Sequence, residues 1–87
     1  MITVSIVSHG HGRMIDALLG DLAGCPEVAR VVLTINVPEQ EPVVPAALAG
    51  RAVVLRNAAP KGFGANHNAA FAHCNTPYYC VLNPDVR

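Results

Sequence analysis

The chain contains four short runs of aliphatic, aromatic and β-branched residues, separated by segments with a helical or polar pattern. Runs of this length and composition are typical of buried strands. The run at 28–35 is apolar apart from Arg30 and Thr34, as expected for a strand that is covered on both faces of a parallel sheet. Pro84 cannot donate to a sheet ladder, so the last strand must end before it. The predicted strands are residues 3–8, 28–35, 51–56 and 78–82.

Two segments between these strands have the pattern of helices. In residues 13–24 the apolar side chains recur at helical spacing, and Gly24 marks the stop. A second helix is predicted over 65–74, and residues 37–45 are too rich in proline for regular structure, which predicts a crossover loop followed by one helical turn at 46–49. The inward positions are Met14, Ile15, Leu18, Leu19 and Leu22 in the first helix, and Phe63, His67, Ala70, Phe71 and Cys74 along the second.

Strands that alternate with crossovers predict an α/β fold, here a Rossmann-like parallel sheet of about four strands with right-handed connections. With the strand order 3-2-1-4, the direction of winding reverses between the first and fourth strands, and ligands bind at such a point. The two strand ends that meet there carry residues 8–12 and 83–85. Two helices and a loop cannot cover both faces of four strands. Either the chain is the front part of a larger domain, or a second copy supplies the cover.

Composition narrows the classes of function. The 87 residues make one small domain, residues 1–87, with no net charge and 14 % charged residues, against a usual share of about 25 %. The absence of a basic surface argues against nucleic-acid partners. No apolar run reaches the roughly 18 residues of a membrane span, and the start lacks the basic region of a signal peptide, so we expect no transmembrane segment and a cytoplasmic protein.

The cysteines give no sign of a disulfide framework or a metal site. Cys25, Cys74 and Cys80 are odd in number and stand at no metal-binding spacing, so we expect them to be reduced and mostly buried.

Two polar segments have the residues of a nucleotide site. Asn83 and Asp85 follow the last strand, where a carboxylate beside a carboxamide suits a hard cation and its phosphates. In residues 61–68, two glycines allow close approach of the backbone to a ligand, the following helix offers N–H groups to an anion, and Lys61 adds a positive charge. Each segment also reads as an ordinary turn or strand-to-helix loop.

Taken together, these motifs resemble the N-terminal, nucleotide-binding part of a family-2 glycosyltransferase with the A-type fold, especially the bacterial rhamnosyltransferase-like branch. The resemblance runs almost the whole length of the chain, and it implies an incomplete half of a nucleotide-diphospho-sugar transferase fold that stops after an Asp-x-Asp-like motif. The motifs that carry it are residues 4–7 (Val-Ser-Ile-Val), 61–68 (Lys-Gly-Phe-Gly-Ala-Asn-His-Asn) and 82–86 (Leu-Asn-Pro-Asp-Val).

The resemblance implies transfer of a sugar, with rhamnose as the example, from a dTDP or UDP donor to a saccharide or lipid-linked acceptor in cell-surface polysaccharide synthesis. It also implies a divalent cation, Mg²⁺ or Mn²⁺, and a cytoplasmic enzyme that is either free or peripheral at the inner membrane face. Asp85 would bind the metal, and Asn83 would face the ribose or sugar. Asn36 stands where the family contacts the base, Asn68 matches a recurrent polar position, and Lys61 departs from the family pattern.

His9 and His11 end the first strand where the family packs on the nucleobase. An imidazole there stacks on the base or donates to it, belongs to a plain loop, or forms part of a metal site, for which no third ligand is evident. The segment 10–15 begins like a dinucleotide fingerprint, but its third glycine is replaced by Ile15.

The family's acceptor site and catalytic base lie beyond Asp85, so we expect the 87 residues alone to be inactive. The alternative is a non-catalytic nucleotide-binding or assembly module that self-associates as a homodimer. A nucleotidyltransferase is a third class, although residues 8–13 supply only Arg13 for its basic loop.

Overall fold

A computed structural model of the chain describes residues 1–10, 12–37, 39, 42–59, 61–82 and 84. Four strands form one sheet in the order β3-β2-β1-β4, and every neighbouring pair is parallel. The strands are β1 (Ile2–Ser8), β2 (Val28–Ile35), β3 (Ala52–Arg56) and β4 (Tyr78–Leu82). The predicted α/β class, strand number and strand order are therefore confirmed, and the direction of winding reverses between β1 and β4.

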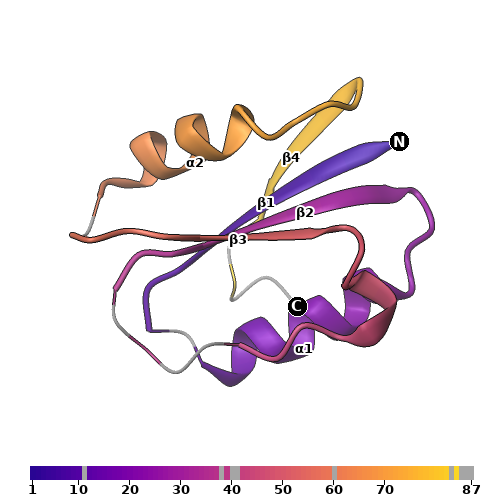
Figure 1. Ribbon diagram of the computed structural model, residues 1–87, viewed down its shortest axis with the longest axis horizontal. Coiled ribbons are helices and arrows are strands. Elements are labelled where there is room, and N and C mark those ends of the chain that lie inside the picture. Colours follow the sequence, from indigo (N-terminus) through magenta and orange to yellow (C-terminus); the bar gives the residue numbers. More distant parts are fainter. Residues whose placement is uncertain (11, 38, 40–41, 60, 83, 85–87) are drawn as a thin grey trace.

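The crossovers place helices on opposite faces of the sheet (Figure 1). Helix α1 (Arg13–Ala23) and the short 3₁₀ helix η1 (Ala46–Leu48) lie on one face, and α2 (Phe63–Phe71) lies on the other. The predicted boundaries hold within one or two residues except in α2, which begins two residues early and ends three residues early. Residues 72–74 instead form turns, because their N–H groups each bond a carbonyl three residues back.

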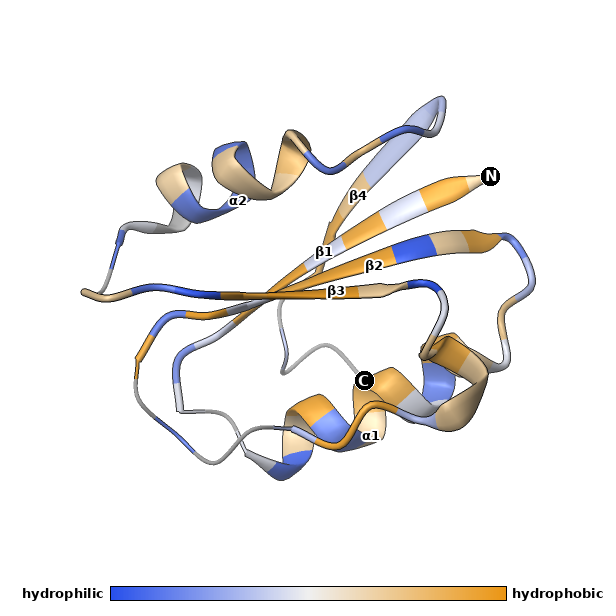
Figure 2. Ribbon diagram, viewed as in Figure 1, coloured by the Kyte–Doolittle hydropathy of each residue, from blue (hydrophilic) through white to orange (hydrophobic). Residues whose placement is uncertain are grey.

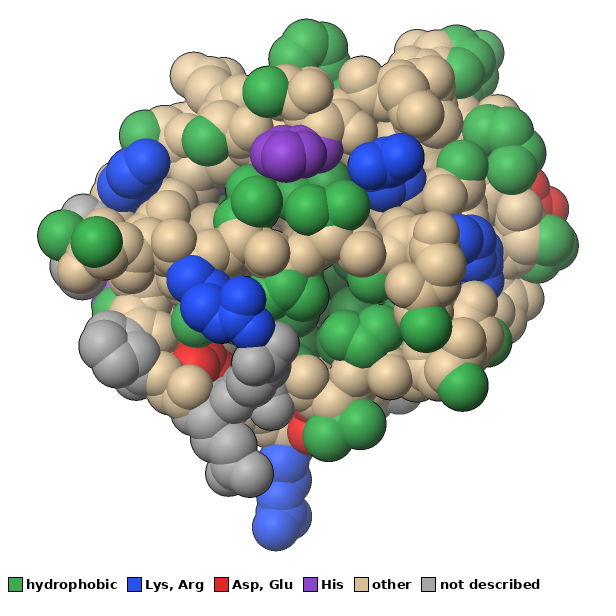
Figure 3. Space-filling model, viewed as in Figure 1, with side chains coloured by type: hydrophobic (Ala, Val, Ile, Leu, Met, Phe, Trp, Pro, Cys, Tyr) green, Lys and Arg blue, Asp and Glu red, His purple; other side chains and the backbone are tan. Residues whose placement is uncertain are grey.

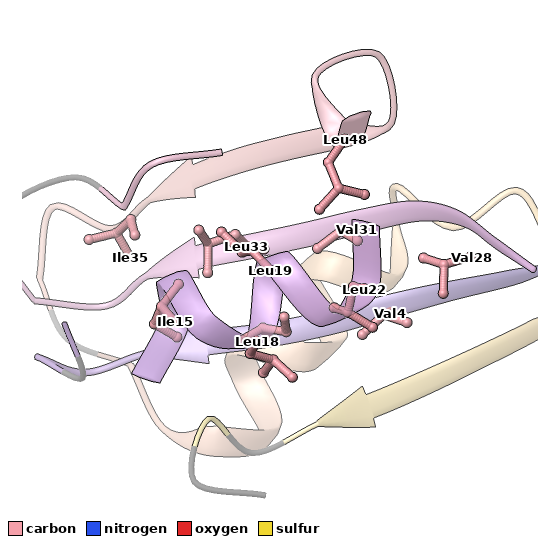
Figure 4. Close-up of a cluster of buried hydrophobic side chains, with 11 residues drawn as sticks. Val4, Ile15, Leu18, Leu19, Leu22, Val28, Val31, Leu33, Ile35 and Leu48 are labelled. Atoms are coloured by element: carbon pink, nitrogen blue, oxygen red, sulfur yellow. The ribbon is translucent and has the colours of Figure 1, made fainter. Parts of the chain in front are cut away.

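The main core lies between α1 and the sheet (Figure 4). Ile15, Leu18, Leu19 and Leu22 are buried there, as their helical spacing predicts, whereas Met14 is 48 % exposed and lies outside the stripe. The strands supply alternate residues to the same face, and β2 is hydrophobic along most of its length (Figure 2). The core members from the sheet and η1 are Val4, Ile6, Val28, Val31, Leu33, Ile35 and Leu48.

The interface between α2 and the sheet is more polar. His67 and Ala70 of α2 are buried, as predicted, and His67 contacts Ser5 of the sheet. Thr3, Ser5 and Thr34 of the sheet are also buried. The inward position predicted for Phe71 is wrong, because its side chain is 57 % exposed. Its ring instead packs edge-on against Tyr79, with centroids 5.0 Å apart, so it extends the apolar surface beside β4.

Cover of the sheet is uneven. In β4, Tyr78 is 67 % exposed and Val81 is 40 % exposed, while the residues of β3 from Ala52 to Leu55 are half-buried. Figure 3 shows apolar side chains at the surface in the middle of one face, framed by Lys and Arg. These observations agree with the expectation that two helices leave part of a four-stranded sheet uncovered.

The three cysteines are free, and each is half-buried, which is less than the burial expected from the sequence. In the described ranges there is no helix whose length and hydropathy would let it cross a membrane.

Candidate functional site at the carboxyl edge of the sheet

Asn36, directly after β2, is the centre of a polar network at the carboxyl edge of the sheet. Its side chain is 4 % exposed, and its backbone N–H donates to the Ser8 carbonyl at 2.9 Å. Its Oδ1 accepts from the Lys61 N–H at 2.8 Å and from Asn57 Nδ2 at 2.9 Å. Its Nδ2 donates to the Lys61 carbonyl and to His9 Nδ1, each at 3.0 Å. All the hydrogen-bonding capacity of this carboxamide is therefore used.

This geometry also fixes the state of His9. Because Lys61 presents both its N–H and its carbonyl to Asn36, only one orientation of the carboxamide satisfies both bonds. The nitrogen of that carboxamide can only donate, so His9 Nδ1 accepts and the ring proton lies on Nε2. The exposed imidazole is thus held in one tautomer at the end of β1.

Two further asparagines complete the network. Asn57, directly after β3, donates from Nδ2 to Asn66 Oδ1 at 2.6 Å, and its own N–H donates to the Ile35 carbonyl at 3.0 Å. Asn66 is 1 % exposed and donates to the Lys61 carbonyl at 3.2 Å. We call Asn36, Asn57 and Asn66 the asparagine network. It fastens the loop before α2 to the ends of β2 and β3 and leaves the Lys61 side chain exposed.

Glu39 ties the proline-rich crossover to the end of β1. Its Oε2 accepts from the Ser8 hydroxyl at 2.8 Å and from the Gly10 N–H at 2.9 Å. Its Oε1 is buried and has no hydrogen-bond partner among the described residues. The turn that it holds requires glycine, because Gly10 and Gly12 have φ values of 76° and 54°.

A second buried pair, Ser5 and His67, lies away from this edge, between β1 and α2. Ser5 Oγ and His67 Nδ1 are 2.7 Å apart, and the two residues are 0 % and 6 % exposed. Burial lowers the pKa of His67, so the neutral ring is favoured. A hydroxyl that is closed to solvent has no access to a substrate, so this pair stabilises the packing of α2.

The structure brings together only some of the residues predicted to bind nucleotide. His9 and the backbone of Lys61 each lie within hydrogen-bond distance of the Asn36 side chain. Asn68 is exposed and lies off the side of α2 that faces the sheet, which is marked by buried Asn66, His67 and Ala70. His11, Asn83 and Asp85 lie outside the described residues, and their roles stay predictions.

No known family model, curated protein or solved structure matches this chain. The assignment of a function therefore depends on the residues of the site and on the chemistry that they allow.

The described residues do not form a metal centre by themselves. Across the described ranges, no three His, Cys, Asp or Glu side chains are grouped closely enough to hold an ion. The cation site expected from the sequence depends on Asp85, which lies outside the described residues.

Three residues that make hydrogen bonds at this edge were not singled out as site residues, namely Asn57, Asn66 and Glu39. Asn57 follows β3 as Asn36 follows β2, so the same rule, a polar residue after a parallel strand, would have found it. The low helix propensity of asparagine is a signal that could have found Asn66. The position of Glu39 against β1 gave no local signal, because the two segments meet only through the fold.

Proposed function

We propose that this domain binds a nucleoside diphosphate sugar across the carboxyl ends of β1 and β2, as the donor-binding part of a glycosyltransferase. The observation that carries this proposal is the asparagine network, which holds three polar elements in one fixed arrangement at the carboxyl edge of the sheet. These elements are the His9 ring, the Lys61 loop and the start of α2. Preorganised polar groups at this edge of a parallel sheet favour ligand binding.

The start of α2 suits the diphosphate. The first bond within this helix runs from Asn66 N–H to the Gly62 carbonyl at 3.1 Å, so the N–H groups of the first turn point out of the helix end. The positive end of the helix dipole and the exposed Lys61 ammonium both attract an anion. Gly62 carries no Cβ and nothing lies within 4 Å of the position of one, so phosphate oxygens can approach the backbone.

The nucleoside would lie toward β1. His9 is exposed and carries its proton on Nε2, so its ring is suited to stack on a base or to donate to it. In this proposal Asn83 contacts the ribose or the sugar, and Asp85 binds the cation, as the resemblance implies. The cation would stabilise the charge that develops on the departing nucleoside diphosphate. Acceptor binding and deprotonation have no assigned residues, so we expect the purified chain to bind the donor without transferring the sugar.

Calorimetric titration with UDP and dTDP, in the presence and absence of Mn²⁺, tests the proposal. We expect His9→Ala and Lys61→Ala each to lower nucleotide affinity about 5-fold to 30-fold, as the loss of one ligand hydrogen bond or charge does. We expect Asp85→Asn to lower affinity only when Mn²⁺ is present.

The chain offers matched controls before the amino ends of β2 and β4, away from the carboxyl edge that carries the site. His73→Ala, Asn75→Ala and Glu27→Gln remove the same kinds of group from exposed positions, and each should leave affinity unchanged. Absence of nucleotide binding by the native chain, or equal losses in the site variants and their controls, would overturn the proposed function.

A further inference from the structure

The outer edge of β4 exposes apolar side chains on both faces of the sheet. Tyr78 is 67 % exposed, and it pairs with Ile2, which packs against the α1 core. Val81 is 40 % exposed and lies on the α2 side with its neighbour Tyr79, whose hydroxyl donates to the His67 carbonyl at 2.7 Å. A partner resting on one face would cover only one of these side chains. Covering both requires an extension of the sheet in its own plane.

The two edges of the sheet differ in their protection against such pairing. Natural edge strands are commonly blocked by charged residues or proline. Strand β3 ends at the exposed Arg56, and the apolar surface on the face in Figure 3 is framed by Lys and Arg. Strand β4, Tyr-Tyr-Cys-Val-Leu, contains no charge and no proline, and none of the described residues pairs with its outer edge.

We propose that two copies of this chain pair through β4, antiparallel and centred on Cys80, so that their two sheets become one. A two-fold axis perpendicular to the sheet produces this arrangement and keeps the α1 faces of both copies on the same side. The inference does not depend on the proposed function.

The strand is self-complementary in this register. The central residue of the five, Cys80, lies opposite Cys80 of the second copy. Tyr78 then lies opposite Leu82 of the second copy on the α1 side, and Tyr79 lies opposite Val81 of the second copy on the α2 side. Cross-strand pairs of aromatic and aliphatic residues are stabilising, and the absence of charge from β4 means that no like charges meet. Each of the two most exposed apolar residues of β4 gains an apolar partner.

Disulfide trapping tests the register. Directly opposed residues of an antiparallel pair have Cα atoms about 4.5 to 5.5 Å apart, which is within the range that a disulfide bridges. In a full-length chain with Cys25→Ser and Cys74→Ser, mild oxidation should give a covalent dimer through Cys80. The matched control retains Cys25 and carries Cys74→Ser and Cys80→Ser, and it should stay monomeric on a non-reducing gel, because Cys25 lies between α1 and β2.

Sedimentation of the native chain tests the interface without a cross-link. We expect a dimer that Val81→Lys converts to a monomer, because the added charge would meet apolar residues of the second copy. Val43→Lys makes the same change at an unrelated site that is 74 % exposed, and it should leave the dimer intact. Circular dichroism shows whether each variant is folded.

A native chain that stays monomeric up to about 1 mM would overturn the proposal. Equal cross-linking of the Cys80 and Cys25 chains would overturn it as well. If Val81→Lys does not fold, cross-linking through Cys80 alone decides between a dimer and a monomer.

Discussion

At the scale of single residues, the carboxamide explains why asparagines hold this edge of the sheet together. A carboxamide donates and accepts at once, so Asn36 can satisfy both the N–H and the carbonyl of Lys61. A carboxylate in the same place would meet the Lys61 carbonyl with a second acceptor. The four bonds of Asn36 also mean that its predicted contact with a nucleobase would compete with the bonds that position the loop.

We expect Asn36→Ala to lower the free energy of unfolding by about 1 to 3 kcal/mol, because the Lys61 N–H and the Asn57 carboxamide lose a partly buried hydrogen-bond partner. Asn36→Asp keeps the shape but loses both donors, so it should also be destabilised. Asn75→Ala, at an exposed position, should stay within about 0.5 kcal/mol of the native chain. Urea denaturation measures all three, and a stability of Asn36→Ala equal to that of Asn75→Ala would show that the network contributes nothing.

His67 predicts how stability depends on pH. Burial lowers its pKa from the ordinary value of 6.5, so below that pH the unfolded chain binds a proton that the folded chain resists. The contribution of His67 is therefore present above pH 6.5 and is lost as the pH falls toward its folded pKa. Urea denaturation at pH 7.5 and at lower pH should show this decrease. His67→Gln should weaken the dependence and His73→Gln, at an exposed site, should preserve it; an unchanged dependence in His67→Gln would contradict this account.

At the scale of elements, the β1–α1 unit places glycines in two different environments. Gly12 precedes α1 with φ 54°, a conformation that other residues adopt at a cost, whereas Gly20 lies inside α1 with nothing within 4 Å of its missing Cβ. Gly12 is required by the turn between β1 and α1. Gly20 lowers the stability of the helix relative to alanine, and no neighbouring atom requires the absence of its side chain.

Substitutions of these glycines should therefore have opposite signs. We expect Gly20→Ala to raise the free energy of unfolding by about 0.5 to 1 kcal/mol, since alanine has the higher helix propensity and the site is open. Gly12→Ala should lower it by about 1 kcal/mol or more because of the positive φ. Thermal unfolding of the two variants provides the comparison, and a shift of the same sign in both would contradict the assignment.

At the scale of the whole molecule, the sheet is completed at its centre and incomplete at its edges. The radius of gyration is 11.7 Å, close to the roughly 12 Å expected for a compact domain of this length. Strands β1 and β2 are bonded along both sides, while β3 and β4 are each bonded along one side by the described residues.

This arrangement predicts the order of hydrogen exchange. Amides of β1 and β2 should exchange slowest, and those of β4 should exchange faster because none of the described residues pairs with its outer edge. The measurement requires dilute protein, where self-association is minimal. Protection in β4 equal to that in β1 under those conditions would mean that the edge is covered within one chain.

The sequence by itself determined the elements and their order. Strand-length apolar runs and a helical stripe report burial directly, so the strands, α1 and the parallel order followed from local pattern and from the handedness of crossovers. The polar residues after β1 and β2 were also evident, because the end of a strand is visible in the sequence.

Only the tertiary structure decided which of those residues meet. The contacts of Asn36 with Lys61, and of Glu39 with Ser8, join segments 25 and 31 positions apart, and no local pattern encodes such separations. The outward turn of Phe71 was missed for a related reason. The α2 helix ends three residues before the predicted limit, and the side of it that faces the sheet is chosen by polar partners, Ser5 for His67 and Asn57 for Asn66, and not by hydrophobicity alone. In α2, hydrophobic periodicity alone does not identify the buried residues, because hydrogen bonds to distant segments determine which side of the helix faces the sheet.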